Sequence, residues 1–194
     1  MCKELCQILE CVRFNLESGM KCLSGMTIFL ILIWTFTAGA EGPLKFSLTS
    51  SAFKDQDVIA NKFSCHGADV NPELNIANIP ENTKSLAMIV DDPDAPEGIW
   101  VHWVVYNISP KTTRIAENSK VGVEGLNDFG TFRYRGPCPP NKKVHHYSFR
   151  VYALKNKLEL NEGFIKSDLE SAMRGKIIAQ ARLVGTYQNS DTHE

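Results

Sequence analysis

Alternation of hydrophobic and polar side chains predicts three long β-strands in this chain. Residues 85–90 are mostly apolar, and residues 100–108 are rich in aromatic and β-branched side chains, which favour strands. Residues 145–154 alternate in the same way, so a third strand is expected there. The loop between the first two strands makes 85–108 the stretch around which the domain is organised.

Two of these strands place histidines on defined faces. A period of two assigns successive side chains to opposite faces of a strand. One face of the 100–108 strand is expected to carry Trp100, His102, Val104 and Tyr106, and the other Val101, Trp103 and Val105. One face of the 145–154 strand is expected to carry His145, Tyr147, Phe149 and Val151.

Shorter elements complete a strand-rich domain. Strands are also expected at 44–49, within 53–64, around Ile115 and at 179–187. The clearest helix signal is a capping box of Ser167 and Glu170, in which the serine caps the helix, and Gly175 weakens or ends that helix. The rest of the polar segment 111–127 is predicted to be loop. The chain is therefore expected to be mainly β with few helices.

Proline-stiffened loops lie beside both histidine-bearing strands. Residues 91–96 hold three aspartates and two prolines, and residues 136–140 hold three prolines. A carboxylate on a stiff loop beside a strand histidine forms a ready-made polar site, although a tight acidic turn beside a core histidine would give the same spacing. Because the arrangement occurs twice, we expect His102 and His145 to converge on one pocket.

Length and charge limit the candidate functions. The chain has 194 residues, which fits one domain and a leader segment, and its formal net charge is −1. A protein without a basic field is not expected to bind nucleic acid.

The first 40 residues are predicted to be an extension and a signal peptide. Residues 26–40 are apolar, follow Lys21 and end in small residues, so cleavage is expected before Glu41. This apolar run is shorter than the ~18–20 residues that a membrane-spanning helix needs. The segment fits an export signal best when it is counted from Met20, the preferred translation start. The alternative is an uncleaved leader that anchors the protein in the membrane.

The domain predicted at 41–194 contains two of the six cysteines, Cys65 and Cys138. Cleavage would release the domain into the periplasm or the medium, without stable membrane insertion. In such an oxidising compartment this pair can form a disulfide. Two buried free thiols are the alternative. No C-x-x-C or H-x-x-x-H spacing accompanies the pair, so we expect no metal and no cofactor.

Short motifs that follow one another along the domain carry a family resemblance. They are D-P-D-A-P from Asp92, G-I-W-V-H-W from Gly98, G-P-C-P-P from Gly136, H-H-Y from His145 and L-V-G-T-Y from Leu183. Together they resemble the phosphatidylethanolamine-binding proteins, the family that includes Raf kinase inhibitor protein, in their bacterial form. The resemblance covers about residues 44–187.

This resemblance implies a fold and a site. The family fold is an antiparallel β-sandwich with a few short helices, in agreement with the strand pattern. The family site is a small anion pocket for phosphate or a phosphorylated head group. Carried over by motif, the ligand-binding residues are Asp92, Trp100, His102, Gly136, Cys138, Pro139, His145 and Tyr147.

The expected chemistry of this pocket depends on its histidines. Asp92 should orient or charge a neighbouring histidine and raise its pKa, because a bare carboxylate would repel phosphate. Residues 136–140 would supply backbone N–H donors, best from Cys138 because proline has none. Phosphate binding should then weaken as the pH rises past the pKa of the histidine.

Three functional classes follow from this reading. The preferred class is an exported, non-catalytic protein that binds phosphate or phosphorylated head groups. The second is a protein–protein regulator that inhibits a kinase or protease, as some relatives do, and a homodimer is also compatible with the resemblance. The third is a hydrolase, but no G-x-S-x-G motif is present, and a disulfide or structural role for Cys138 is favoured over a nucleophile paired with His145.

Overall fold

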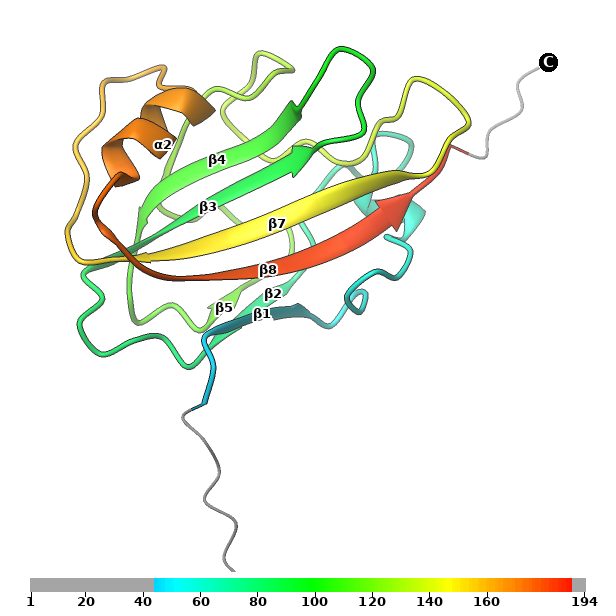
Figure 1. Cartoon of the computed structure of the whole chain (residues 1–194). Coiled ribbons are helices and arrows are strands. Elements are labelled where there is room, and N and C mark those ends of the chain that lie inside the picture. Colours follow the sequence, from blue (N-terminus) through cyan, green and yellow to red (C-terminus); the bar gives the residue numbers. More distant parts are fainter. Residues whose placement is uncertain (1–43, 190–194) are drawn as a thin grey trace, which may run out of the picture. The chain divides into compact units, whose positions relative to one another are not determined.

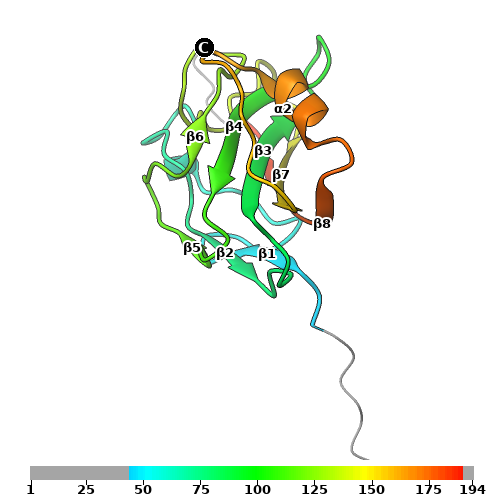
Figure 2. The same ribbon diagram turned by 90° about the vertical axis from the view of Figure 1, so that its left-hand side faces the viewer.

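Two antiparallel β-sheets form the part of the chain that this computed structural model describes, residues 44–189 (Figures 1 and 2). The larger sheet has the order β6 (Val123–Glu124), β4 (Trp100–Ile108), β3 (Ser85–Asp92), β7 (His145–Leu154) and β8 (Ile177–Tyr187). The smaller sheet has the order β1 (Ser47–Ser50), β2 (Leu74–Ala77) and β5 (Arg114–Ile115). All neighbouring strands are antiparallel, so the predicted antiparallel β-sandwich is confirmed.

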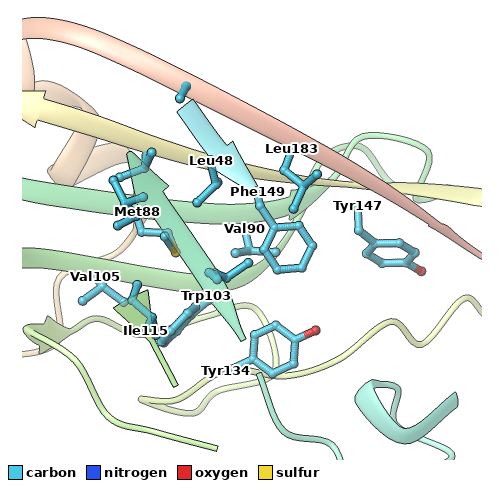
Figure 3. Close-up of a cluster of buried hydrophobic side chains, with 14 of the residues drawn as sticks. Leu48, Met88, Val90, Trp103, Val105, Ile115, Tyr134, Tyr147, Phe149 and Leu183 are labelled. Atoms are coloured by element: carbon cyan, nitrogen blue, oxygen red, sulfur yellow. The ribbon is translucent and has the colours of Figure 1, made fainter. Parts of the chain in front are cut away.

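Alternate side chains of the larger sheet meet the smaller sheet and form the main core. On β3 these are Leu86, Met88 and Val90, which share a buried cluster with Leu48 of β1 and Ile115 of β5 (Figure 3). Burying one such side chain stabilises the fold by roughly 1.5–3 kcal/mol. The predicted face of β7 lies in the same core and carries Tyr147, Phe149 and Val151.

The opposite face of the larger sheet is covered by α2 (Lys166–Met173) and the loop before it. Leu169 and Met173 are four residues apart and bury their side chains together against this face, next to Phe164. Figure 1 shows α2 lying across the larger sheet, away from the three short strands. The two sheets and this helix share one fold, so the described residues form a single domain.

The helix begins earlier than the sequence predicts. Its N-cap is Ile165 rather than Ser167, and the N–H of Ile165 donates to the carboxylate of Asp168 at 3.0 Å. An aspartate near the start of the helix therefore supplies the reciprocal half of a capping box. Gly175 follows the last turn with a φ of +67°, as expected for a residue that ends a helix.

Two other segments differ from the predicted strands. Residues 53–64 contain a short 3-10 helix, η1 (Asn61–Phe63), and an isolated bridge from Val58 to Thr186 in place of a strand. Strands β2 and β6, of 4 and 2 residues, are not predicted, because β2 closely follows a proline and β6 lies in a mostly polar segment.

A β-bulge in β4 changes the face that each side chain occupies. Asp91 pairs with Val101, but the residue before Asp91 pairs with Trp103, so His102 is an extra residue without its own partner on β3. A strict period of two is therefore wrong for this strand. Val101 lies in the core under α2, whereas Trp103 lies in the core between the sheets. Bulges commonly redirect a side chain beside a functional site, and this one redirects His102.

The predicted leader, residues 1–40, and the expected cleavage site before Glu41 lie outside the described residues. Between residues 44 and 189, no helix has the length and apolar character needed to cross a membrane. The signal peptide and the start at Met20 stay predictions from the sequence.

Candidate functional site

The candidate site lies where the end of β3 meets the starts of β4 and β7. Antiparallel pairing places Asp92, the last residue of β3, opposite Trp100, the first residue of β4. On the other side, Asp94 accepts a hydrogen bond from the backbone N–H of His146 in β7 at 2.8 Å. The two proline-stiffened loops that precede β4 and β7 therefore lie at the same end of the sheet.

Asp92 and His145 form a buried pair at this site. Nδ1 of His145 donates to Oδ2 of Asp92 at 2.7 Å, and only 4% of the aspartate side chain and 1% of the histidine side chain are exposed. The other carboxylate oxygen of Asp92 accepts the backbone N–H of Asp94 at 2.8 Å. These two bonds fix the carboxylate beside His145, which is the arrangement needed to orient an imidazole.

His102 is the second buried histidine, and its ring has a defined tautomer. Its Nδ1 lies 2.8 Å from the carbonyl oxygen of Arg135, which can only accept, so Nδ1 carries a proton. Nε2 has no hydrogen-bond partner among residues 44–189 and is the ring nitrogen left for a ligand. Burial lowers the pKa of His102, while the Arg135 carbonyl and the charge of Asp92 raise it by less. His102 is therefore mainly neutral near pH 7.

Tyr147 contributes a buried hydroxyl that makes no hydrogen bond within the described chain. Its ring lies edge-on to that of His102, with the ring centroids 5.2 Å apart. Figure 3 shows Tyr147 at one end of the main core, with the hydroxyl directed away from the other labelled side chains. Burial, and next the charge of Asp92, raise the pKa of this hydroxyl far above its usual value, so it remains a donor. A buried donor without a partner is costly and is a candidate ligand contact.

A pocket of about 440 Å³ opens at this site. Its lining consists of Asp92, Ala95, Pro96, Glu97, Trp100, His102, Phe129, Cys138 and Pro140. The wall includes two prolines and the rings of Trp100 and Phe129, and its charged side chains are carboxylates. A larger hollow of about 540 Å³, beside β6 and the loop before α2, is lined by no histidine. Unlike that hollow, the pocket at the end of β3 is lined by the buried titratable groups Asp92 and His102.

The predicted ligand-binding residues fall into three groups in this structure. Trp100 and Cys138 line the pocket together with Asp92 and His102. His145 and Tyr147 lie behind the lining, in contact with Asp92 and His102 respectively. Gly136 and Pro139 are buried and are not part of the lining.

Gly136 has a structural reason to be glycine. A Cβ at this position would lie 1.9 Å from the carbonyl oxygen of Phe63. The N–H of Gly136 donates to Oδ1 of Asp69 at 2.7 Å, so it is not free to donate to a ligand. The remaining N–H of residues 136–140 is that of Cys138, because the other residues are prolines, and it lies near the hydroxyl of Tyr147.

A disulfide joins Cys65 and Cys138, whose Cα atoms are 5.4 Å apart. The N–H of Cys65 also donates to the carbonyl of Pro137 at 3.0 Å, so the bridge and this bond tie the 136–140 loop to the segment before β2. The alternative of two free thiols does not hold in this structure. A nucleophilic Cys138 paired with His145 would require the bridge to be broken. Among residues 44–189, no cluster of three or more His, Cys, Asp or Glu side chains is arranged to hold a metal ion.

Phe129 is a wall of the pocket that the strand pattern does not reveal. Its ring lies edge-on to Trp100 at 5.6 Å and to His102 at 5.2 Å, measured between centroids. Asn127 holds its loop, because the amide oxygen accepts the N–H of Phe129 at 3.0 Å and the amide nitrogen donates to the carbonyl of His102 at 3.2 Å. The sequence offers no periodicity or motif here, only an aromatic residue next to a glycine.

Comparison with known proteins identifies a family for this chain. A family model described as phosphatidylethanolamine-binding protein matches residues 49–188. A UPF0098 protein of Methanothermobacter thermautotrophicus is 43% identical over 149 residues, which cover 73% of this chain and 98% of the relative. A UPF0098 protein of Chlamydia muridarum is 45% identical over 147 residues, which cover 73% of this chain and 97% of the relative.

Two solved structures are similar in the same region. A crystal structure of a phosphatidylethanolamine-binding protein homolog from Chlamydia trachomatis is 43% identical, has a TM-score of 0.72, and matches 74% of this chain and 97% of its own. The crystal structure of YbcL from E. coli, described as a member of the mammalian PEBP family, is 32% identical, has a TM-score of 0.70, and matches 75% of this chain and 99% of its own. On both kinds of similarity, the chain belongs to the phosphatidylethanolamine-binding protein family.

Proposed function

We propose that this protein is a non-catalytic binding protein whose pocket holds phosphate or a phosphorylated head group. The observation that carries the proposal is the buried hydroxyl of Tyr147, which has no partner within the described residues, next to His102 with its free Nε2. Two hydrogen-bonding groups left without internal partners, one in the pocket lining and one directly behind it, are suited to an external oxygen-rich ligand.

The donors of the pocket suit a small oxyanion. The Tyr147 hydroxyl stays protonated, and the N–H of Cys138 lies near it. Nε2 of His102 donates when the ring is protonated and accepts from a P–OH group when it is neutral. The carboxylate of Asp92 accepts a hydrogen bond from Nδ1 of His145, so one of its oxygens is already paired with a donor.

The walls of the pocket favour a ligand with a small apolar part. Trp100, Phe129, Pro96 and Pro140 line the opening and shield the polar groups from water. Hydrogen bonds to a bound phosphoryl group become stronger as water is excluded. Because no lysine or arginine lines the pocket, selectivity should come from shape and hydrogen bonds more than from net charge.

No serine, threonine or free cysteine nucleophile lines the pocket, which supports a non-catalytic role. The lining contains no serine or threonine, and its one cysteine, Cys138, is bonded to Cys65. Nucleophilic catalysis needs such a group beside a base.

Export to the periplasm or the medium is also part of the proposal. The disulfide between Cys65 and Cys138 is of a kind that persists in oxidising compartments. Mass spectrometry of the exported protein tests this directly: an N-terminus at Glu41 is expected, and an N-terminus near Met1 would refute cleavage.

The binding role is tested by calorimetric titration with inorganic phosphate and with phosphoethanolamine. Tyr147→Phe should weaken phosphate binding roughly three- to tenfold, because it removes one hydrogen bond from the complex. It should not destabilise the free protein, since the hydroxyl has no partner there. Binding by the wild type should weaken as the pH rises from about 5 to 8, because protonated His102 is the stronger donor.

The matched control is Tyr134→Phe, another buried tyrosine whose hydroxyl donates to the Phe63 carbonyl at 3.4 Å. It should leave the phosphate affinity unchanged. No measurable binding of either compound by the wild type, or equal affinities of the wild type and Tyr147→Phe, would contradict the proposed function.

A further inference from the structure

Asp69 holds the loop that forms one side of the pocket, although it does not line the pocket itself. Oδ1 of Asp69 accepts the N–H of Gly136 at 2.7 Å, and Oδ2 lies 2.8 Å from Nε of Arg135. Arg133 is a weaker partner, with Nη2 at 3.4 Å from Oδ2. The Asp69 side chain is only 15% exposed, so water screens these contacts less than those on the open surface.

Through Arg135, this carboxylate is linked to His102 by the main chain. The carbonyl of Arg135 accepts the Nδ1 proton of His102 at 2.8 Å, and the N–H of Arg135 donates to the carbonyl of His102 at 3.1 Å. A shift of Arg135 would therefore release the bond that sets the tautomer of the His102 ring.

The side chain of Arg135 provides a second link, to the aromatic wall. Its guanidinium carbon lies 5.1 Å from the ring centroid of Phe129, within the range of a cation–π contact. Phe129 in turn contacts both His102 and Trp100 edge-on. The ion pair between Asp69 and Arg135 therefore supports two groups that shape the pocket, His102 and Phe129.

We propose that Asp69 is a positioning residue for the ligand site: by holding Arg135, it keeps Nε2 of His102 as the ligand-facing nitrogen and keeps Phe129 against the pocket. This inference rests on the proposed function and names residues that act behind the lining.

A purely structural role for Asp69, as an anchor for the loop, is less well supported. The same loop is already tied down by the disulfide and by the bond from the Cys65 N–H to the Pro137 carbonyl. Arg135, in contrast, has Asp69 as its one ion-pair partner among the described residues, and its buried Nε makes no well-aligned hydrogen bond. Removing the carboxylate should therefore disturb Arg135 more than it disturbs the loop.

Asp69→Asn tests the inference with little change in shape. Asp69 has a φ of +55°, which asparagine tolerates well, and the asparagine carbonyl can still accept the N–H of Gly136. Partners that orient ligand-binding histidines affect affinity by 10–100-fold at metal sites, so we expect the dissociation constant for inorganic phosphate to rise about tenfold. The ¹⁵N signals of the His102 ring should also show loss of the single Nδ1–H tautomer.

Asp55→Asn is the matched control, because Asp55 also accepts a backbone N–H, that of Val184 at 2.8 Å, but lies away from the pocket lining. It should change neither the phosphate affinity nor the His102 signals. A folded Asp69→Asn protein with wild-type affinity and wild-type ring signals would overturn the inference.

A double-mutant cycle with Arg135→Met separates positioning from general destabilisation. Methionine keeps an apolar stem beside Phe129 but removes the guanidinium. If Asp69 acts through Arg135, the double variant should bind phosphate no more weakly than Arg135→Met alone, whereas additive losses would contradict the mechanism. Should the wild type bind neither phosphate nor phosphoethanolamine, the proposed function fails, and the ring signals still decide whether Asp69 sets the tautomer.

Discussion

Nδ1 of His145 lies 2.7 Å from Oδ2 of Asp92, and both side chains are almost fully buried. The same contact occurs nearby on the surface, where Nδ1 of His146 lies 2.7 Å from Oδ2 of Asp94 with 46% and 42% of the side chains exposed. Two aspartate–histidine pairs of equal length thus differ chiefly in burial. Since water screens the exposed pair, the two should contribute very differently to stability.

Asp92→Ala should lower the free energy of unfolding by about 3 kcal/mol, because it leaves the buried ring of His145 without its partner. Asp94→Ala is the surface counterpart and should cost less than about 1 kcal/mol. Urea unfolding at pH 7 measures both values. Equal losses in the two variants would show that burial of the Asp92–His145 pair is not what makes it important.

Protonation of His102 should destabilise the folded protein. Burial lowers the pKa of His102 from 6.5, so between the folded value and 6.5 the unfolded chain binds more protons than the folded one. The free energy of unfolding contributed by this residue should therefore fall as the pH drops below about 6.5, and level off below the folded pKa.

His102→Asn isolates this contribution, because asparagine does not titrate and its amide nitrogen, at about the position of Nδ1, can still donate to the Arg135 carbonyl. Urea unfolding of both proteins from pH 7.5 to 5.0, in phosphate-free buffer, gives the difference in stability at each pH. As the pH falls, the free energy of unfolding of the wild type should decrease relative to that of the variant. A difference between the two proteins that is constant with pH would contradict the effect of burial on His102.

The long strands are predictable from local sequence, but the face of the sheet on which each side chain lies is not always predictable. Alternation and aromatic content give β7 its bounds and its inner face, including Tyr147 and Phe149. In β4 the same rule fails at His102, because the bulge depends on how β3 pairs with it and no local pattern encodes that. The failure falls at a residue of the candidate site, which is where departures from local rules are expected.

Alternation on β3 also explains why only one of two adjacent aspartates belongs to the site. Asp92 points to the side of the main core and meets His145, whereas Asp91 points to the other side and is held by Arg150 and by Lys166 of α2. Asp69 and Phe129 cannot be found from sequence alone, because they come from loops whose approach to the pocket is decided by the fold of the whole chain.

Loss of the disulfide should have a large effect on the free energy of unfolding and a small effect on phosphate affinity. The bridge joins residues 73 positions apart, and replacing Cys65 and Cys138 by serine should cost about 2–5 kcal/mol of unfolding free energy. The Cys65 N–H still bonds to Pro137 and Asp69 still holds Gly136, so phosphate affinity should fall only a few-fold. Urea unfolding and calorimetry measure the two effects, and dithiothreitol should destabilise the wild type but not the double-serine variant.

Gly136→Ala should be among the most destabilising single substitutions in the domain. The added Cβ would lie 1.9 Å from the Phe63 carbonyl oxygen, so the two backbone segments would have to separate, at a cost of about 3 kcal/mol or more. Gly130 offers the contrast, because its φ is +73° but a Cβ there would meet nothing within 4 Å. Gly130→Ala should therefore cost only about 1–2 kcal/mol, from backbone conformation alone. Thermal and urea unfolding of both variants test the difference, and a Gly136→Ala protein as stable as Gly130→Ala would mean that the loop and η1 are not held as closely as described.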